Sequence, residues 1–370
     1  MPFLFIFASI LNNDIVVFNH TVQIGDAMKL KNIPELLNYI NRCFINITSD
    51  YKNDFVGLEI SPENEYLCKQ EMKEAGFHEF LGDEKDWPSL YLNTEQFKNS
   101  MYHKNIHFDN IKEGNISFEK HLIPASQLFN VEAIINDPHK ELNDSMTLRA
   151  LDEAYETSVL TIDGDTWMMD IYSEAFTIDP FAKKAKGNVI TLGLGIGYFI
   201  YMAMHNPNVK SITAIEIDPT IIELFKKYIE PQFPKHIPLT IVEENAKTWF
   251  TKENIDKFDY VFVDTYQSSD DGYEMMQSML ESYLPPLEKV DFWIEDSCIE
   301  FLRSLIIIYF SQFINKQDIH HQDSYYNEIM KKIAKYFEKD IIIDSEETLK
   351  NILYDRKILR EIINTKANNT

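Results

Sequence analysis

Cysteine and basic residues are scarce in this chain of 370 residues. Its three cysteines, Cys43, Cys68 and Cys298, are far apart in the sequence, so they give neither a disulfide framework nor a metal-ligand spacing. Lysine and arginine number 35 against 59 aspartates and glutamates, which leaves a formal charge of −24. An acidic surface of this kind repels phosphate backbones, so we expect no nucleic-acid partner.

Several familiar segments and motifs are also missing. No apolar run has the length that we expect of a membrane-spanning helix. Residues 1–11 (MPFLFIFASIL) are apolar but follow no basic region, so we expect a first β-strand there and not a signal peptide. His103 and His107 are four residues apart, but their neighbours alternate as in a strand, so we expect no metal site. These absences favour a cytoplasmic protein with no membrane partner.

A glycine turn between two apolar runs is the most informative feature present. Residues 189–192 feed a turn that holds Gly193, Gly195 and Gly197, a helix-like segment follows, and a second apolar run ends at Glu216. Glycines let the backbone approach a ligand, and an acid in this position accepts hydrogen bonds from ribose hydroxyls. The spacing is G-x-G-x-G and not G-x-G-x-x-G, so we expect a compact nucleoside and not a dinucleotide.

Two later apolar runs also end in polar side chains. One run leads into Glu243, Glu244 and Asn245, and the strongly apolar segment KFDYVFVD ends at Asp264. Because the carboxyl ends of parallel strands meet in one crevice, we expect the glycine turn, Glu216, Asn245 and Asp264 to be neighbours in space. The sequence therefore predicts an α/β fold with a Rossmann-like, doubly wound sheet.

Residues from about 161 to 298 resemble the class I S-adenosylmethionine-dependent methyltransferase fold, and within it the spermidine-synthase-like branch. The matching segments are TLGLGIG, AIEID, EENA and FDYVFVD. Upstream, TIDGDTWMMDIYSE is similar to the β-hairpin and Tyr-x-Glu stretch that precede the nucleotide fold in that branch. The whole chain is most similar to uncharacterised bacterial methyltransferase-like proteins.

The resemblance implies S-adenosylmethionine, or its decarboxylated form, as the cofactor. The residues that it implies for cofactor binding are Gly193, Gly195, Gly197, Glu216, Ile217, Asn245, Ala246 and Asp264. It implies a catalytic role for Asp264, which would accept a hydrogen bond or a proton from the acceptor, with Tyr266 as a pocket wall or aromatic partner of a cation. The residues expected to contact substrate are Tyr172, Glu174, Trp167 and Gln267.

Departures from the family pattern leave the reaction open. Thr191 stands where many methyltransferases carry an acid, and Asn245 replaces the adenine-binding acid. Aminopropyltransferases follow the first reaction-centre acid with Ser-Ser-Asp-Pro or similar, whereas Thr265, Tyr266 and Gln267 follow Asp264 here. We therefore expect methyl transfer to an amine or hydroxyl of a small molecule, and the acidic charge of the chain favours a cationic one. An aminopropyltransferase and a non-catalytic cofactor-binding or scaffold protein are the alternatives.

The remaining sequence predicts four regions. They are an N-terminal α+β domain (1–120), a β-hairpin segment that packs on the catalytic domain (121–180), the cofactor-binding domain (181–300) and a C-terminal helical extension (301–370). Asp163-Gly164 is a strong hairpin signal, and the stretches around Tyr91 and Ile106 predict short strands. A homodimer is compatible with this organisation.

Overall fold

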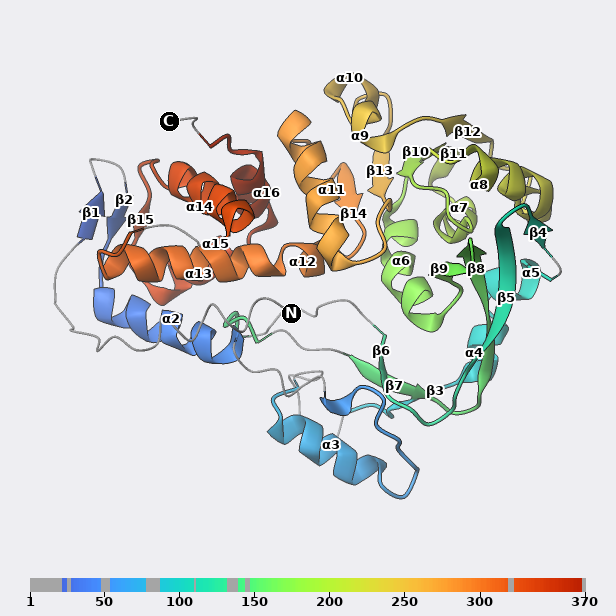
Figure 1. Cartoon of the computed structure of the whole chain (residues 1–370), viewed down its shortest axis with the longest axis horizontal. Coiled ribbons are helices and arrows are strands. Elements are labelled where there is room, and N and C mark those ends of the chain that lie inside the picture. The colour runs from blue at the N-terminus through green and yellow to red at the C-terminus, as the bar shows by residue number, and fades with distance from the viewer. Residues whose placement is uncertain are drawn as a thin grey trace. The chain divides into compact units, whose positions relative to one another are not determined.

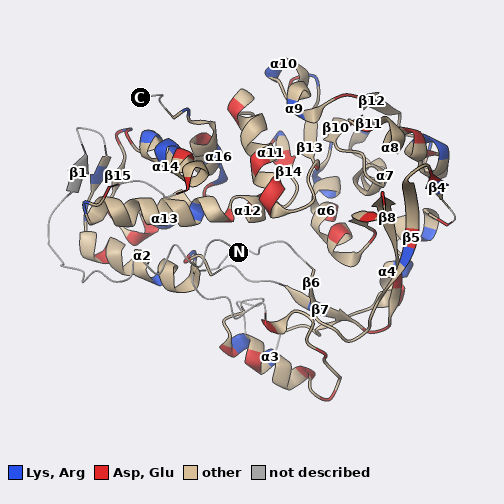
Figure 2. Ribbon diagram, viewed as in Figure 1, with Lys and Arg blue, Asp and Glu red and all other residues tan. Residues whose placement is uncertain are grey.

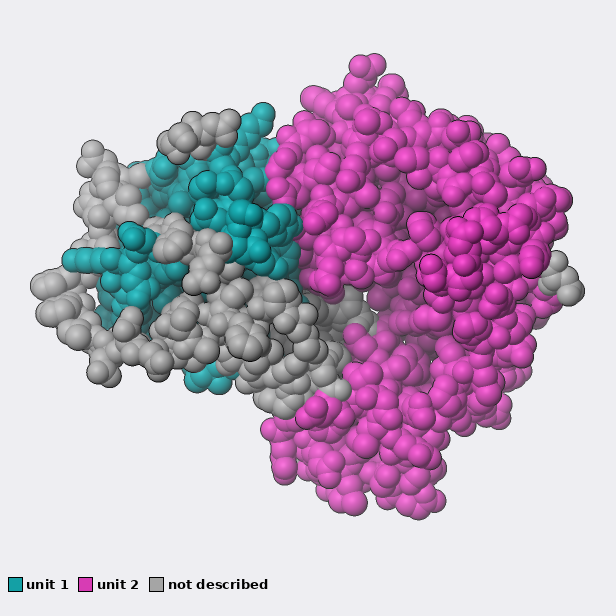
Figure 3. Space-filling model, in the orientation of Figure 1, with its two compact units in different colours: residues 1–53, 136–145, 299–370 teal, residues 54–135, 146–298 magenta. Residues whose placement is uncertain are grey.

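The chain folds into two compact units, which Figure 3 colours separately. The computed structural model describes residues 22–24, 28–47, 54–77, 87–109, 111–131, 139–143, 147–318 and 323–367. The first unit comprises residues 1–53, 136–145 and 299–370, and the second comprises residues 54–135 and 146–298. The first strand expected within residues 1–11 lies outside the described residues.

A five-stranded parallel sheet forms the centre of the second unit (Figure 1). Its order is β12-β11-β10-β13-β14, with bounds β10 (Gly187–Leu192), β11 (Val209–Glu216), β12 (Leu239–Glu243), β13 (Tyr260–Val263) and β14 (Val290–Phe292). Residues 189–192 and 260–263 are buried without alternation, as expected of parallel strands that are covered on both faces. This is the Rossmann-like α/β arrangement that the sequence predicts.

The chain reverses its direction across this sheet between β10 and β13. From β10 it proceeds to β11 and β12 on one side, and it then returns to place β13 against the other side of β10. Leu192 pairs with Val263, so the residues that follow these two strands, Gly193 and Asp264, leave the sheet side by side. A crevice at such a switch point is where open α/β sheets bind ligands.

Helices connect the strands of the parallel sheet. Their bounds are α6 (Tyr172–Lys184), α7 (Tyr198–Met204), α8 (Pro219–Leu224), a π-helical turn η3 (Phe225–Ile229), a 3₁₀ turn η4 (Glu230–Gln232), α9 (Ala246–Trp249), α10 (Lys252–Ile255), α11 (Ser269–Ser282) and α12 (Glu295–Cys298). Asp218 and Asn245 cap α8 and α9 through their side chains, because each accepts from a backbone N–H two residues ahead. The caps fix the points at which these helices begin at the carboxyl edge of the sheet.

A four-stranded antiparallel sheet leads into the parallel one. Its order is β4-β5-β8-β9, with bounds β4 (Lys112–Glu113), β5 (Ile116–Ile123), β8 (Tyr155–Ile162) and β9 (Asp165–Met169). Asp163 and Gly164 close the β8–β9 hairpin with φ values of 56° and 87°, as the Asp-Gly signal predicts. The remaining elements of this unit are α3 (Glu65–Glu74), β3 (Tyr91–Leu92), α4 (Thr94–Lys98), α5 (Met101–Asn105), β6 (Phe129–Asn130) and β7 (Leu148–Leu151).

The first unit is mainly helical. Its elements are β1 (Val22–Ile24), β2 (Met28–Leu30), α2 (Ile33–Ile47), α13 (Glu300–Ile314), α14 (Ser324–Tyr336), β15 (Ile342–Ile343), α15 (Glu346–Tyr354) and α16 (Arg356–Asn364). The strands form a small sheet in the order β1-β2-β15. Helix α13 packs against α2, α14 and α15. The C-terminal region is helical, as the sequence predicts.

The compact units differ from the regions expected from the sequence. Helix α2 packs on α13 and α15, so residues 28–47 join the C-terminal helices and not a separate N-terminal domain. Residues 54–131 instead belong to the unit that holds the parallel sheet, where β5 pairs with β8 over its whole length. Pairing between strands far apart in the sequence determines which residues belong to which unit, and local sequence patterns do not reveal such pairing.

Two local expectations are wrong. The stretch around His103 and Ile106 is not a strand, because α5 ends at Asn105 and begins at the cap Ser100. The expectation that no segment has spanning length is also wrong, since Glu295–Ile314 is a helical stretch of 20 residues with a mean hydropathy of 1.4. In this structure 78% of that stretch is buried, as expected of a core helix in a globular protein.

We expect Gly193→Ala to lower the free energy of unfolding more than Gly164→Ala does. Both glycines have positive φ, but a Cβ at Gly193 would lie 1.8 Å from the Asp264 carbonyl oxygen, whereas a Cβ at Gly164 meets nothing within 4 Å. Backbone strain alone costs about 1–3 kcal/mol, and the collision adds to it. Urea denaturation of both variants measures the difference. Equal losses would contradict the close approach of β10 and β13.

Candidate active site

A cavity of about 610 Å³ lies at the carboxyl edge of the parallel sheet. The segments that follow β10, β11, β12 and β13 all contribute to its lining, together with β9 and α6. Every residue that the sequence analysis selects as a site residue lines this cavity except Tyr172. The structure thus brings the glycine turn, Glu216, Asn245 and Asp264 together.

The glycine turn brings the backbone close to the cavity. Gly193 donates its N–H to the Ile215 carbonyl at 2.9 Å, which ties the turn to the end of β11. The Thr191 hydroxyl donates to the Gly193 carbonyl at 3.1 Å, so this threonine stabilises the turn from below. A Cβ at Gly195 would approach the Met168 side chain to about 3.1 Å, which places Met168 over the turn.

The carboxylate of Glu216 binds the backbone on both sides of the crevice. Its Oε2 accepts from the Leu194 N–H at 3.2 Å, and its Oε1 accepts from the N–H groups of Ile217 and Asp218 at 2.8 and 3.0 Å. Glu216 therefore holds the glycine turn against the end of β11. Each carboxylate oxygen has more than one lone pair, so it can also accept from a ligand hydroxyl.

Asn245 lines the cavity and also caps helix α9. Its Oδ1 accepts from the Lys247 N–H at 2.9 Å and so caps α9. This cap engages one lone pair of the Asn245 carbonyl oxygen, which keeps a second one, and the amide nitrogen is a further donor on this side chain.

Two carboxyl groups line the cavity and have raised pKa values. Burial raises the pKa of Asp264 to about 7. Burial, with smaller contributions from Asp264 and Asp170, raises the pKa of Glu174 to about 8. Because the charge of one disfavours the charge of the other, a positive group bound between them would relieve both costs.

Tyr266 and Trp167 form walls of the cavity. The Tyr266 side chain is buried and its hydroxyl donates to the Trp293 carbonyl, so this hydroxyl is engaged within the protein. Trp167 lies in β9 and is 48% exposed, which leaves a large aromatic face beside the cavity. Aromatic faces attract cations.

Tyr172 does not reach the cavity, contrary to its expected role. Its ring packs 5.0 Å from that of Phe97, and it lines a second, apolar cavity of about 230 Å³. Tyr172 and Glu174 both lie in the first turn of α6, where residues two apart do not face the same side. With Glu174 in the first cavity, Tyr172 faces away from it.

Asp271 lines the cavity but is not among the site residues expected from the sequence. Burial tends to raise its pKa, but hydrogen bonds from the Ser268 side chain and from the N–H groups of Gln267 and Ser268 hold the pKa below its usual range. These bonds form a capping box at the start of α11. In the sequence, the Ser-x-x-Asp pattern of residues 268–271 predicts this capping box. Asp271 therefore fixes the loop that carries Gln267.

Acidic residues outnumber basic residues in the lining of the cavity. The acidic residues that line it are Glu174, Glu216, Glu244, Asp264 and Asp271, and the lining includes one basic residue, Lys247. Helix α11 begins at this edge and carries acidic but no basic side chains (Figure 2). Such a cavity favours a cationic ligand.

Part of the chain matches a known family. Residues 169–275 match the family model of the spermine/spermidine synthase domain. A curated relative, the polyamine aminopropyltransferase of Sulfurisphaera tokodaii, is 28% identical over 119 residues, which is 30% of this chain and 39% of the relative. The chain thus matches about two fifths of that protein's length. The likeness covers the segment that builds most of the cavity and supports the spermidine-synthase-like branch expected from the sequence.

Solved structures give more distant matches. Spermidine synthase from Thermotoga maritima is 17% identical, covers 35% of this chain and 48% of its own, and gives a TM-score of 0.24. A spermidine synthase in complex with the transition state analogue AdoDATO is 18% identical, with 35% and 49% covered and a TM-score of 0.25. Human methyltransferase-like protein 13 in complex with SAH is 15% identical, with 35% and 69% covered and a TM-score of 0.24.

We expect Glu174→Gln to increase stability at high pH. Because the folded-state pKa of Glu174 is about 8, the unfolded chain ionises first, and wild-type stability falls as the pH rises from about 5 to 8. An amide does not ionise, so the variant is more stable by an amount of order 1 kcal/mol at pH 8 and by less at pH 5.

Urea denaturation across this pH range measures the difference. Glu244→Gln, at an exposed glutamate of the same cavity lining, is the matched control. Parallel stability curves for wild type and Glu174→Gln would contradict the assignment.

Proposed function

We propose that this protein transfers an aminopropyl group from decarboxylated S-adenosylmethionine to a small cationic amine. The observation that carries the proposal is the pair of carboxyl groups, Glu174 and Asp264, with raised pKa values in one acidic cavity at the switch point of the sheet. The match of residues 169–275 to the spermine/spermidine synthase domain supports it.

The volume and the lining of the cavity support an adenosyl ligand. The glycine turn lets a ligand approach the backbone, and Glu216 offers carboxylate lone pairs at the end of β11, where a ribose hydroxyl donates in related sheets. Apolar side chains of Leu194 and Ile217 complete the lining beside it. A volume of about 610 Å³ lies in the range of small-molecule sites.

The charge of the cavity favours the decarboxylated cofactor over S-adenosylmethionine. S-Adenosylmethionine carries a carboxylate, and its decarboxylated form carries only positive charge. The one basic residue of the lining, Lys247, lies in α9. Glu174 lies on α6 and Asp264 follows β13, so both acids come from other parts of the cavity wall. A carboxylate placed next to these two acids would be repelled, and an ammonium group would be attracted.

Asp264 is the residue that we assign to proton transfer. When bound, the sulfonium group makes the neighbouring carbon electrophilic. Asp264, with a pKa of about 7, can accept the proton that the acceptor nitrogen releases as its bond to carbon forms, the carbon–sulfur bond breaks and methylthioadenosine leaves. Glu174 would hold the positive charge of the acceptor, and Trp167 would cover it with an aromatic face. Orientation within the cavity supplies most of the remaining rate.

Methyl transfer is the second candidate. In place of the family's Ser-Ser-Asp-Pro pattern, Asp264 is followed by Thr265, Tyr266 and Gln267. The next acid of the lining along the chain, Asp271, accepts the hydrogen bonds of a capping box. The second polyamine-binding acid at the usual position is therefore missing, and this observation favours methyl transfer. A cofactor-binding protein without catalysis is the third candidate.

We expect decarboxylated S-adenosylmethionine to bind more tightly than S-adenosylmethionine or S-adenosylhomocysteine in isothermal titration. We also expect incubation with linear diamines and triamines to yield methylthioadenosine, detected by mass spectrometry. Release of S-adenosylhomocysteine with methylated amine would instead support methyl transfer. Binding without either product would support the non-catalytic candidate, and no binding at all would reject the adenosyl site.

We expect Asp264→Asn to lower kcat by roughly 100-fold or more, and to weaken binding of the cationic cofactor by a much smaller factor. The amide keeps the size of the side chain but does not accept a proton at neutral pH. Asp270→Asn, at an exposed aspartate of α11 that does not line the cavity, is the matched control. Retained turnover in Asp264→Asn would remove Asp264 from this role.

A further inference from the structure

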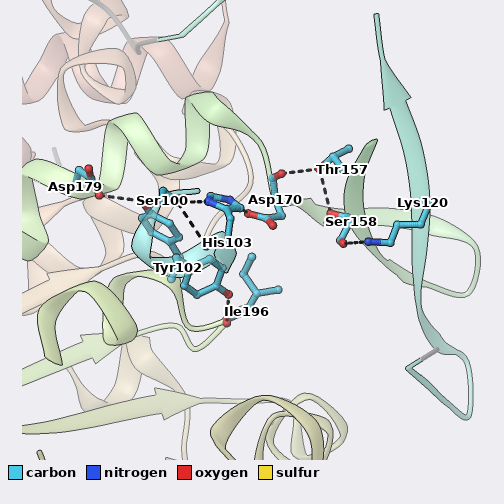
Figure 4. A network of polar contacts seen from close by, with 10 residues as sticks. Ser100, Tyr102, His103, Lys120, Thr157, Ser158, Asp170, Asp179 and Ile196 are labelled. Atoms are coloured by element: carbon cyan, nitrogen blue, oxygen red, sulfur yellow. Dashed lines mark hydrogen bonds and ion pairs between the residues drawn. The ribbon is translucent and has the colours of Figure 1, made fainter. Parts of the chain in front are cut away.

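The short helix α5 contacts two separate parts of the cavity wall. It lies outside the segment matched by the family model, and none of its residues lines the cavity. Figure 4 shows the two contacts: the Tyr102 hydroxyl reaches the Ile196 carbonyl, and the His103 ring reaches the Asp170 carboxylate. Adjacent residues of one helix thus reach the cofactor side and the acceptor side of the cavity.

Tyr102 holds the glycine turn. Its side chain is fully buried, and its hydroxyl donates to the Ile196 carbonyl at 2.8 Å. Ile196 lies between Gly195 and Gly197, so this bond fixes the carbonyl of the turn itself. The Tyr102 ring packs 4.8 Å from the ring of Tyr198, the first residue of α7. The turn is therefore held by a side chain that does not itself line the cavity.

His103 holds the start of α6. Its Nε2 lies 2.7 Å from Asp170 Oδ1, its Nδ1 lies 2.6 Å from Ser100 Oγ, and both partners of the first contact are almost fully buried. The Asp170 carbonyl also accepts from the Thr157 hydroxyl at 2.5 Å. Asp170 comes just before α6, and Glu174 lies in the first turn of that helix. The contact therefore sets the direction from which Glu174 enters the cavity.

The hydrogen-bonded series Ser100, His103 and Asp170 has the residue types of a hydrolytic triad. Its surroundings argue against nucleophilic catalysis. Ser100 is the cap residue of α5, and its Oγ accepts from the His103 N–H. Neither of the two cavities described above includes Ser100 in its lining. A nucleophile needs space for the group that it attacks. We therefore assign this network to positioning the start of α6 and not to covalent catalysis.

We propose that Tyr102 and His103 are positioning residues that brace the two sides of the cavity independently. Tyr102 sets the glycine turn for the cofactor, and His103, through Asp170, sets Glu174 for the acceptor. The kinetic consequences rest on the proposed function, whereas the structural consequences do not.

Two variants separate the two braces. Tyr102→Phe keeps the ring and removes the bond to Ile196, so we expect cofactor affinity to fall by about fivefold with the acceptor KM unchanged. His103→Gln keeps a polar side chain but not the geometry of the ring, so we expect kcat/KM for the acceptor to fall by roughly tenfold or more with cofactor affinity unchanged. Tyr66→Phe and His107→Gln, at exposed positions, are the matched controls.

Hydrogen exchange of the whole chain, followed by mass spectrometry, supplies a readout that needs no activity. We expect faster exchange of residues 194–198 in Tyr102→Phe and of residues 170–176 in His103→Gln, with the other segment unchanged in each case. Asp170→Asn is expected to reproduce the exchange pattern of His103→Gln.

The outcomes distinguish this inference from the proposed function. If the wild type neither binds an adenosyl compound nor modifies an amine, the proposed function fails, and the exchange pattern still tests the braces. Equal loosening of both segments in both variants, or loss of cofactor affinity and acceptor kcat/KM together, would show a general structural role and overturn the proposal. Unchanged exchange in both segments would overturn it as well.

Discussion

The site depends on the close approach of two strand ends at the switch point of the parallel sheet. A Cβ at Gly193 would lie 1.8 Å from the Asp264 carbonyl oxygen, so only glycine lets β10 and β13 leave the sheet side by side. This approach places the Asp264 carboxyl at the base of the turn that would receive an adenosyl group. The glycine turn and Asp264 are thus linked through backbone, with no intervening side chain whose motion would separate them.

The charge distribution of the cavity has a cost for the empty protein. Glu174 and Asp264 have raised pKa values chiefly because burial disfavours their charged forms. Among the residues that the structure describes, no basic side chain contributes to the pKa of either acid, and the lysine of the lining lies in α9. Binding sites are often built from groups that destabilise the unbound state. A ligand that brings positive charge to this place recovers the cost, and this difference in free energy selects cations over neutral or anionic molecules.

Much of the fold and part of the site follow from the sequence, for identifiable reasons. Unbroken apolar runs predict buried parallel strands, and parallel strands put their polar ends on one edge, so the meeting of Glu216, Asn245 and Asp264 follows from local patterns. The orientation of Tyr172 does not, because it depends on the residue at which α6 begins. The contacts of α5 and the partners of α2 join segments far apart in the chain, and no local periodicity records such pairings.

The cavity wall combines matched and unmatched parts of the chain, and this division bears on specificity. Glu174, Glu216 and Asp264 lie within residues 169–275, which match the spermine/spermidine synthase domain. Trp167 and Trp293, which line the same cavity, lie outside that segment. The acids that the proposed function assigns to cofactor, acceptor charge and proton therefore lie in the matched segment, and two of the large aromatic walls lie outside it. Because an apolar wall discriminates ligands by shape and size, substitutions at these two tryptophans would change which ligands the cavity admits.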